Sequence, residues 1–598
     1  MKKWFLIGLL ILFFPLFSAA LNATSEVTDS LSILISPQDV KPGDVVKVLL
    51  VHEENMAGIN IEIETVSPQT NLKLLSEQRR EEFPSWVIVA CHIPSEGLYR
   101  ISVTQNGERL FSTSFDVASK SASRKESPSI WSSTRQWSRD VENLYSAWLE
   151  SLFLDDEEGA YWGSLQDVLR DSKRNFLYNH LDLDEDNKLV MEPDCADNPY
   201  FLRAYFSWKL GLPFGFHKCD WGGRLGVPLC TEWVSNQEPR EYGDSDIQAF
   251  QTFLRSIMNT VHSGSARTAL ADNTTDLYPV KLTKKHLKPG VVFADPYGHT
   301  LNLVRWIPQT SEQSGKLIAV DAQPNGTISL KRFWQGTFLF TNRDVVGEPG
   351  FKAFRPIVET ENSLRLLSNA EIADHPDYGN FSTEQNNLDQ NSFYDTIDGL
   401  INPQPQDPVS VFRELHEAVF EQLKSRQIAI EKSEEYMKKT GNAVIPMPSG
   451  SGIFQTVGPW EDYSTPSRDM RVLIALDVLL DFPEKILRNP QVFQLSGNKT
   501  PQAVNVELVK LHNQLAQEYT ISYSRSDGER QELTLAEIID RMKALEMGYN
   551  PNDCMEIRWG APKGSEESAS CSRRAPADQI EKMLAYRRWF RDRVRPIR

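Results

Sequence analysis

The stretch from residue 193 to residue 216, PDCADNPYFLRAYFSWKLGLPFGF, carries the strongest fold signal in this 598-residue chain. Residues 200 to 210 are apolar on almost every side, and Gly211 is a typical helix end. The pattern predicts a buried helix. Cys195 lies at its N-terminal end, where exposed N–H groups and the helix dipole stabilise a thiolate and an oxyanion. Cys195 is therefore a candidate catalytic nucleophile.

A thiol nucleophile needs a base, and His299 has the most suitable context among the ten histidines. It opens a predicted strand after a Pro-Tyr-Gly turn, and residues 316 to 322 form a second predicted strand. In an antiparallel hairpin centred on the intervening loop, paired residue numbers add to about 622, so Asp321 is a diagonal neighbour of His299. A carboxylate there would orient the imidazole and favour its charged form. The alternative roles are a strand cap for His299 and a turn cap for Asp321.

These residues follow a known order: Asp-Cys-Ala, a buried helix, Gly-Leu-Pro, and Leu-Lys-Pro-Gly before a histidine-bearing strand. The order resembles the NlpC-type branch of the papain-like cysteine peptidases. It is also similar to the transglutaminase-like branch, which has the same sequence of cysteine, histidine and aspartate. The resemblance covers about residues 180 to 340 and implies a papain-like α+β domain with Cys195 as nucleophile, His299 as base and Asp321 as orienter.

The resemblance further implies hydrolysis of amide bonds in cell-wall (peptidoglycan) peptides or an envelope protein. A transglutaminase-like acyl transferase would use the same triad with an amine as acceptor. The alternative from another class is a non-catalytic envelope-binding protein with a degenerate papain-like domain. The sequence departs from the NlpC-type pattern at Ala196, where that branch has serine, and at Pro199, which removes a helix hydrogen bond if the helix begins at Cys195. Asp194 and Asp197 also place negative charge beside the thiol.

Six cysteines allow a prediction of disulfide pairing, because near neighbours in loop-rich sequence tend to pair in oxidising compartments. We predict two short-loop disulfides, Cys219–Cys230 and Cys554–Cys571. Cys91 follows a strand-like run and is expected to be a buried thiol. Cys195 is left over, and it is either the nucleophile or a partner in a third disulfide with Cys219, Cys230 or Cys91.

The first 23 residues predict export. Two lysines precede a fourteen-residue apolar run, and small residues follow, with cleavage expected after Ala20 or Ala23. Since no later stretch is apolar enough to span a bilayer, we expect a periplasmic or extracellular, envelope-associated protein without stable membrane insertion. The net charge of −17 argues against binding to nucleic acid or to anionic membranes.

The rest of the chain predicts several domains. Short β-rich runs separated by turns, including the hairpin signal Asn106-Gly107, indicate an immunoglobulin-like β-sandwich, while apolar residues at helical spacing indicate a helical C-terminal part. The expected order is a signal peptide at 1–23, the sandwich at 24–118, a linker at 119–135, the papain-like domain at 136–358, a linker or wrapping loop at 359–407, and the helical domain at 408–598.

Four further patterns bear on possible binding sites. Asp182, Asp184 and Asp186 alternate as in a calcium loop, but Pro193 occupies the position of the bidentate glutamate, so a solvated acidic turn is preferred and no cofactor is required. Trp306 and Trp334 are core residues or the wall of a substrate cleft. Residues 460–471 (WEDYSTPSRDMR) and the basic ending at 586–598 (YRRWFRDRVRPIR) have no assigned chemistry; the ending is expected to be a packed helix with an arginine-rich face.

Overall fold

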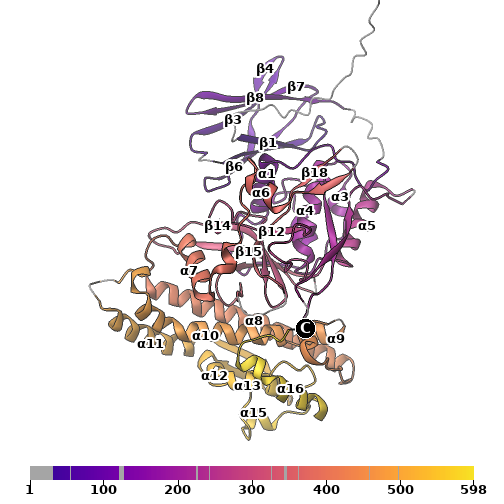
Figure 1. The fold of residues 1–598 in the computed structure, drawn as a ribbon. Coiled ribbons are helices and arrows are strands. Elements are labelled where there is room, and N and C mark those ends of the chain that lie inside the picture. Colours follow the sequence, from indigo (N-terminus) through magenta and orange to yellow (C-terminus); the bar gives the residue numbers. More distant parts are fainter. Residues whose placement is uncertain are drawn as a thin grey trace, which may run out of the picture.

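The structure is a computed structural model that describes residues 31–53, 56–119, 127–223, 226–241, 243–324, 326–341, 347–360, 363–456, 458–495, 497 and 499–597. The predicted signal peptide and residues 120–126 of the predicted linker lie outside these residues. Figure 1 shows a β-sheet part, a mixed central part and a helical part stacked in chain order. Every helix of the described residues is too short or too polar to cross a bilayer.

The N-terminal part consists of two antiparallel four-stranded sheets that share one hydrophobic core. The strands are β1 (Leu31–Ser36), β2 (Val45–His52), β6 (Ser85–His92) and β5 (Leu74–Arg80) in one sheet, and β4 (Gln69–Asn71), β3 (Ile59–Val66), β7 (Gly97–Gln105) and β8 (Glu108–Val117) in the other. Asn106 and Gly107 form the β7–β8 turn with positive φ, as the hairpin signal predicts. Cys91 is a free thiol in the shared core, and burial raises its pKa to about 11. The predicted all-β N-terminal region is therefore confirmed.

A seven-stranded antiparallel sheet forms the centre of the molecule. Its order is β12 (Leu277–Pro279), β17 (Gly350–Phe354), β13 (Val292–Asp295), β14 (His299–Ile307), β15 (Lys316–Ala322), β16 (Ile328–Arg332) and β9 (Tyr161–Trp162). One face packs in a common core with α1 (Arg139–Leu152), α4 (Asp197–Leu210) and α5 (Asp246–Met258). Because α4 is buried along its whole length, as its sequence predicts, it is fixed against the sheet that carries the histidine.

Two segments predicted as linkers belong to the central part. Trp131 is buried and its indole donates to the Leu212 carbonyl at 2.8 Å, so residues 127–135 pack on the domain. Residues 359–407 include α6 (Asn369–Asp374) and α7 (Gln390–Ile401), which cover the second face of the sheet. The segment was predicted as a linker or wrapping loop, and its polar composition hides four apolar residues at helical spacing that pack in this core, Phe393, Tyr394, Ile397 and Ile401.

The C-terminal part is largely helical, as predicted. Its long helices are α8 (Pro408–Lys439), α10 (Pro466–Arg488), α11 (Pro501–Glu518) and α16 (Ala577–Arg591), with one short hairpin, β20 (Thr520–Ser524) and β21 (Arg530–Thr534). Asp407 caps α8 by accepting from the Ser410 N–H at 2.8 Å, and Pro408 follows it. In Figure 1 these helices lie below the central sheet, and the C-terminus lies beside α9 (Pro459–Tyr463), between the two parts.

Candidate active site

Cys195 occupies a turn two residues before the first residue of α4, and its thiol is free and partly exposed. Pro199 is the third residue of the helix, where a backbone N–H has no helical partner, so the proline costs no hydrogen bond. The hydroxyl of Thr300, next to the predicted base, donates to the carbonyl of Cys195. This bond ties the cysteine turn to the start of β14.

His299 and Asp321 meet at one end of the β14–β15 hairpin. Asn302 pairs with Val320 and Leu303 with Ala319, which is the register that the sequence predicts at this end of the hairpin. The imidazole Nε2 lies 2.7 Å from the Asp321 Oδ1, and the two side chains are only 19% and 6% exposed. Since Nε2 faces the carboxylate, Nδ1 is the nitrogen left for the thiol of Cys195, which is within hydrogen-bonding reach of the ring.

The charges of these three groups favour an ionised histidine. Burial alone would lower the pKa of His299, but the charges of Asp321 and Cys195 and hydrogen bonds to both raise it to about 10. Burial likewise opposes ionisation of Asp321, and the imidazolium outweighs it, so the pKa of Asp321 is lowered. The arrangement therefore favours a proton on His299 and a negative charge on Asp321.

The two aspartates that flank Cys195 have other functions. The Asp194 carboxylate accepts the N–H groups of Ala196 at 2.8 Å and Asp197 at 3.1 Å, so it caps α4. Burial, with a contribution from the charge of Asp194, raises the pKa of Asp197 to about 8, so this side chain is neutral at pH 7. Only Asp194 therefore contributes negative charge beside the thiol.

The same cap changes which donors are available for an oxyanion. Asp194 takes the N–H groups of Ala196, Asp197 and Asn198, which the helix end was expected to offer. The N–H of Cys195 itself donates to no acceptor among the described residues. This N–H is therefore available to donate to an oxyanion that forms beside the sulfur.

A polar chain that the sequence did not reveal connects the triad to the helical part. Gln323 donates to the Asp321 Oδ2 at 2.6 Å, and Arg468 at the start of α10 donates to the Gln323 Oε1 at 3.2 Å. Arg471, one turn later, binds Asp295 at 2.7 Å. Both arginines belong to residues 460–471. The density of polar and aromatic groups in that stretch is the feature of the sequence that could have indicated a role near the site.

We predict that Gln323 positions the triad rather than reacting. Gln323→Leu removes the donor that holds Asp321, so kcat should fall by roughly tenfold with little change in KM. The alkaline limb of the pH profile should remain near that of the wild type, because the variant keeps the charged Asp321 carboxylate that raises the pKa of His299. Steady-state kinetics across pH measure both; Gln323→Asn, which keeps an amide donor, should recover part of kcat, and an unchanged kcat in the leucine variant would contradict the prediction.

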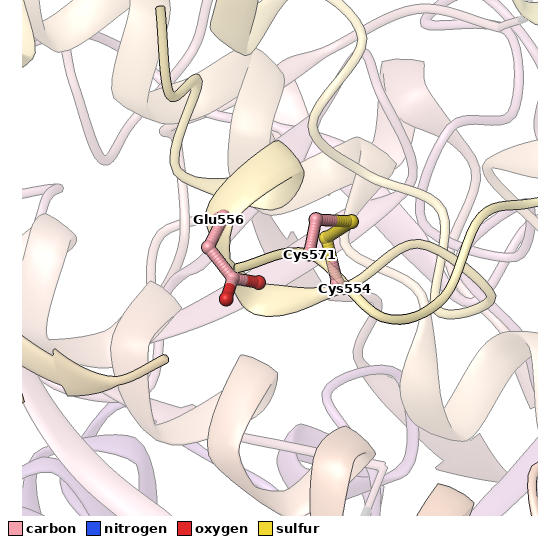
Figure 2. A group of neighbouring side chains, drawn as sticks. All are labelled: Cys554, Glu556 and Cys571. Carbon is pink, nitrogen blue, oxygen red and sulfur yellow. A yellow bond between two sulfur atoms is a disulfide. The ribbon is translucent and has the colours of Figure 1, made fainter. Parts of the chain in front are cut away.

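Both predicted disulfides are present, Cys219–Cys230 and Cys554–Cys571. Figure 2 shows Glu556 close to the second disulfide, and the three ligand-type atoms lie within 4.8 Å of one another. Both sulfur atoms are bonded, and the Glu556 carboxylate accepts from the Ser526 N–H at 2.6 Å and the Ser570 hydroxyl at 2.8 Å. The group is therefore a packed disulfide with a satisfied carboxylate.

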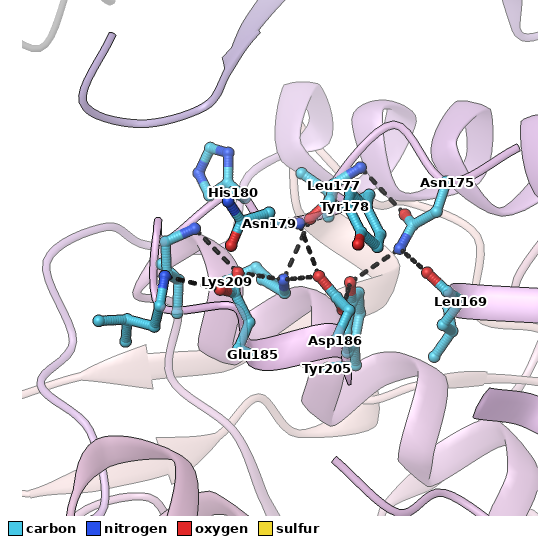
Figure 3. A network of polar contacts seen from close by, with 12 residues as sticks. Leu169, Asn175, Leu177, Tyr178, Asn179, His180, Glu185, Asp186, Tyr205 and Lys209 are labelled. Carbon is cyan, nitrogen blue, oxygen red and sulfur yellow. Dashed lines mark hydrogen bonds and ion pairs between the residues drawn. The ribbon is translucent and has the colours of Figure 1, made fainter. Parts of the chain in front are cut away.

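The predicted acidic loop does not gather its three carboxylates. Asp182 binds Lys41, Asp184 accepts from the Asn187 amide at 2.6 Å, and Asp186 binds the Lys209 ammonium at 2.8 Å. Lys209 is fully buried and also pairs with Glu185, as Figure 3 shows. A lysine ammonium from α4 is therefore the cation beside Asp186.

We predict that Lys209→Met strongly destabilises the protein. The substitution leaves two buried carboxylates without their cation, which costs about 3 to 5 kcal/mol. The pKa of Glu185 is lowered because Lys209 and hydrogen bonds outweigh burial, so this stabilisation is present above about pH 4.5 and is lost as pH falls further. Thermal unfolding at pH 7 and pH 4 should show a large loss of Tm at pH 7 and a smaller one at pH 4. Lys188→Met, at an exposed site, is the control; equal loss at both pH values would contradict the prediction.

The two predicted tryptophans have different surroundings. Trp306 is buried among the residues under α6 and α7, and its indole donates to the Leu287 carbonyl at 2.6 Å. Trp334 lines a cavity of about 760 Å³ between the central and helical parts, together with Tyr297, Phe340, Ile474 and Arg593. Tyr297 lies two residues before His299, but Cys195, His299 and Asp321 are not among the residues that line this cavity. Of the two tryptophans, only Trp334 contributes to its wall.

No family model matches this chain, and no curated protein matches it significantly. The candidate site is therefore described by its own geometry.

Proposed function

We propose that the chain is an exported, cysteine-dependent amide hydrolase with a papain-like central domain and an immunoglobulin-like N-terminal domain. The observation that carries the proposal is the free Cys195 thiol beside His299, whose other ring nitrogen lies 2.7 Å from Asp321. Three groups from separate parts of the chain meet in the order nucleophile, base and orienter.

The reaction follows from this geometry. The Cys195 sulfur, its proton held by His299, attacks the amide carbonyl carbon, and the carbonyl oxygen becomes an oxyanion near the N–H of Cys195. The C–N bond breaks as the His299 imidazolium donates its proton to the leaving amine. Water then attacks the thioester carbonyl carbon and gives a proton to His299. The C–S bond breaks, and the carboxylic acid and the Cys195 thiolate are released. Asp321 stabilises His299 whenever its imidazole carries the second proton.

We place this reaction in the cell envelope. The N-terminal signal pattern and the two disulfides both fit an oxidising compartment outside the cytoplasm. The substrate that the resemblance to NlpC-type peptidases implies for that setting is the peptide of the cell wall.

Alkylation without reductant tests the proposal at its first step. Iodoacetamide and peptide mass spectrometry on the folded protein should modify Cys195 but not Cys91, which is buried, nor the four disulfide cysteines. If Cys195 carries no label, the proposal that the chain is a thiol enzyme fails. Incubation with sacculi, with and without a primary amine, then separates hydrolysis from acyl transfer, because only transfer incorporates the amine.

A further inference from the structure

The turn before His299 is contacted by the tail that follows α16. Gly298 has φ +90°, and a Cβ placed there would lie 3.0 Å from the Arg595 Nη1 and 3.0 Å from the Gln455 Nε2. The phenol of Tyr297 also donates to the Arg593 carbonyl at 3.2 Å. Gly298, the residue before His299, thus leaves room for two donor side chains of the helical part, and the Gln455 amide also donates to the Ser263 hydroxyl at 2.7 Å.

The Arg595 guanidinium has no carboxylate partner within 4 Å among the residues that the structure describes. It lies 4.9 Å from the centre of the Phe454 ring. The two acidic groups whose charges act on it, Asp295 and Glu461, have other partners: Asp295 binds Arg471 at 2.7 Å, and Glu461 accepts the Thr456 N–H at 2.9 Å. Burial and the charge of Arg267 lower the pKa of Arg595 to about 9, so its charge is incompletely compensated.

A second guanidinium is linked to the triad through Gln323. Arg468 donates to the uncharged Gln323 Oε1 at 3.2 Å, and Gln323 in turn donates to Asp321. An arginine fork binds a carboxylate in two parallel hydrogen bonds, and this geometry favours carboxylate over a neutral amide.

We propose that Arg595, with Gln455 beside it, binds a free carboxylate of the substrate next to the scissile amide. The inference rests on the proposed function and specifies its substrate class: peptides with an acidic group within about one residue of the bond that is cut. The helical part therefore contributes a specificity residue to the active site of the central part.

Two alkylating reagents of similar size test the subsite separately from hydrolysis. Iodoacetate carries a carboxylate and iodoacetamide does not; in both cases a sulfur–carbon bond forms at Cys195, the carbon–iodine bond breaks, and iodide leaves with the electron pair. The imidazolium of His299 attracts iodoacetate by itself, so the informative quantity is the change caused by Arg595→Gln. We expect the iodoacetate rate constant to fall about tenfold and the iodoacetamide rate constant to change less than twofold.

Arg588→Gln is the matched control, because Arg588 is exposed on α16 and outside the site; both rates should stay at wild-type values. Arg595→Lys keeps the charge and should retain most of the iodoacetate rate. Unchanged iodoacetate reactivity in Arg595→Gln overturns the inference while the proposed function stands. Equal loss with both reagents in both Arg595 variants assigns the residue a structural role and also overturns it. If neither reagent modifies the wild type, the proposed function fails and the inference falls with it.

Peptide pairs then identify the source of the carboxylate. One pair differs by a C-terminal acid or amide, and the other by a glutamate or glutamine side chain beside the scissile bond. The wild type should cleave one acidic member with at least tenfold higher kcat/KM, and Arg595→Gln should remove that preference. Equal cleavage of both members in both pairs contradicts the inference.

Discussion

Replacing Cys195 with alanine is expected to lower kcat/KM for amide hydrolysis by roughly 10⁴-fold or more, because the covalent intermediate can no longer form. The sulfur is partly exposed and α4 is anchored along its whole length, so the substitution should leave the fold and its Tm unchanged. Release of peptides from sacculi, followed by chromatography and mass spectrometry, measures the effect.

The chain provides a matched control in its second free cysteine. Cys91→Ala removes a thiol from the N-terminal core and should leave kcat/KM at the wild-type value, although it costs some stability. Equal peptide release by the wild type and Cys195→Ala would exclude thiol catalysis, even with Cys195 fully reactive toward iodoacetamide.

Replacing Asp321 with asparagine should lower kcat by about 10³-fold and change the pH profile. His299 must carry a proton to release the leaving amine, so wild-type activity should decline as pH rises through about 10, the raised pKa of this histidine. In Asp321→Asn the charge of Asp321 no longer raises the pKa of His299, while burial still lowers it. The pH at which activity declines on the alkaline side should therefore fall by roughly two units.

The profile of kcat/KM from pH 5 to 11 measures the shift, with Asp116→Asn as control because that aspartate is exposed in the N-terminal part. An alkaline limb at the same pH in Asp321→Asn and the wild type would show that Asp321 does not set the protonation of His299.

The hairpin carrying His299 and Asp321 could be predicted from sequence because its register depends on one local loop. The strands are continuous from that loop to the site except for an irregularity between Leu303 and Arg305, and the predicted pairing holds at the end that matters. The helix after Cys195 was equally clear, since a stretch apolar on all sides can only be buried.

The surroundings of the triad could not be predicted in the same way. Arg468 and Arg595 reach it from helices and turns far along the chain, and no local periodicity relates them to His299. The acidic loop shows the same limit: its third aspartate is paired with a lysine from α4, and alternating carboxylates do not indicate which cation they meet. Long-range ion pairs of this kind follow from packing, which sequence spacing does not encode.

The bond from Arg468 to Gln323 has a consequence for how this protein can be inherited and engineered. Recombination that transferred residues 136–358 to another chain would move Cys195, His299 and Asp321 together but would leave behind Arg468, which contacts Gln323, and Arg595, which lies beside Gly298. The central part is therefore not a freely exchangeable module. Any graft built from it must include α10 and the tail after α16.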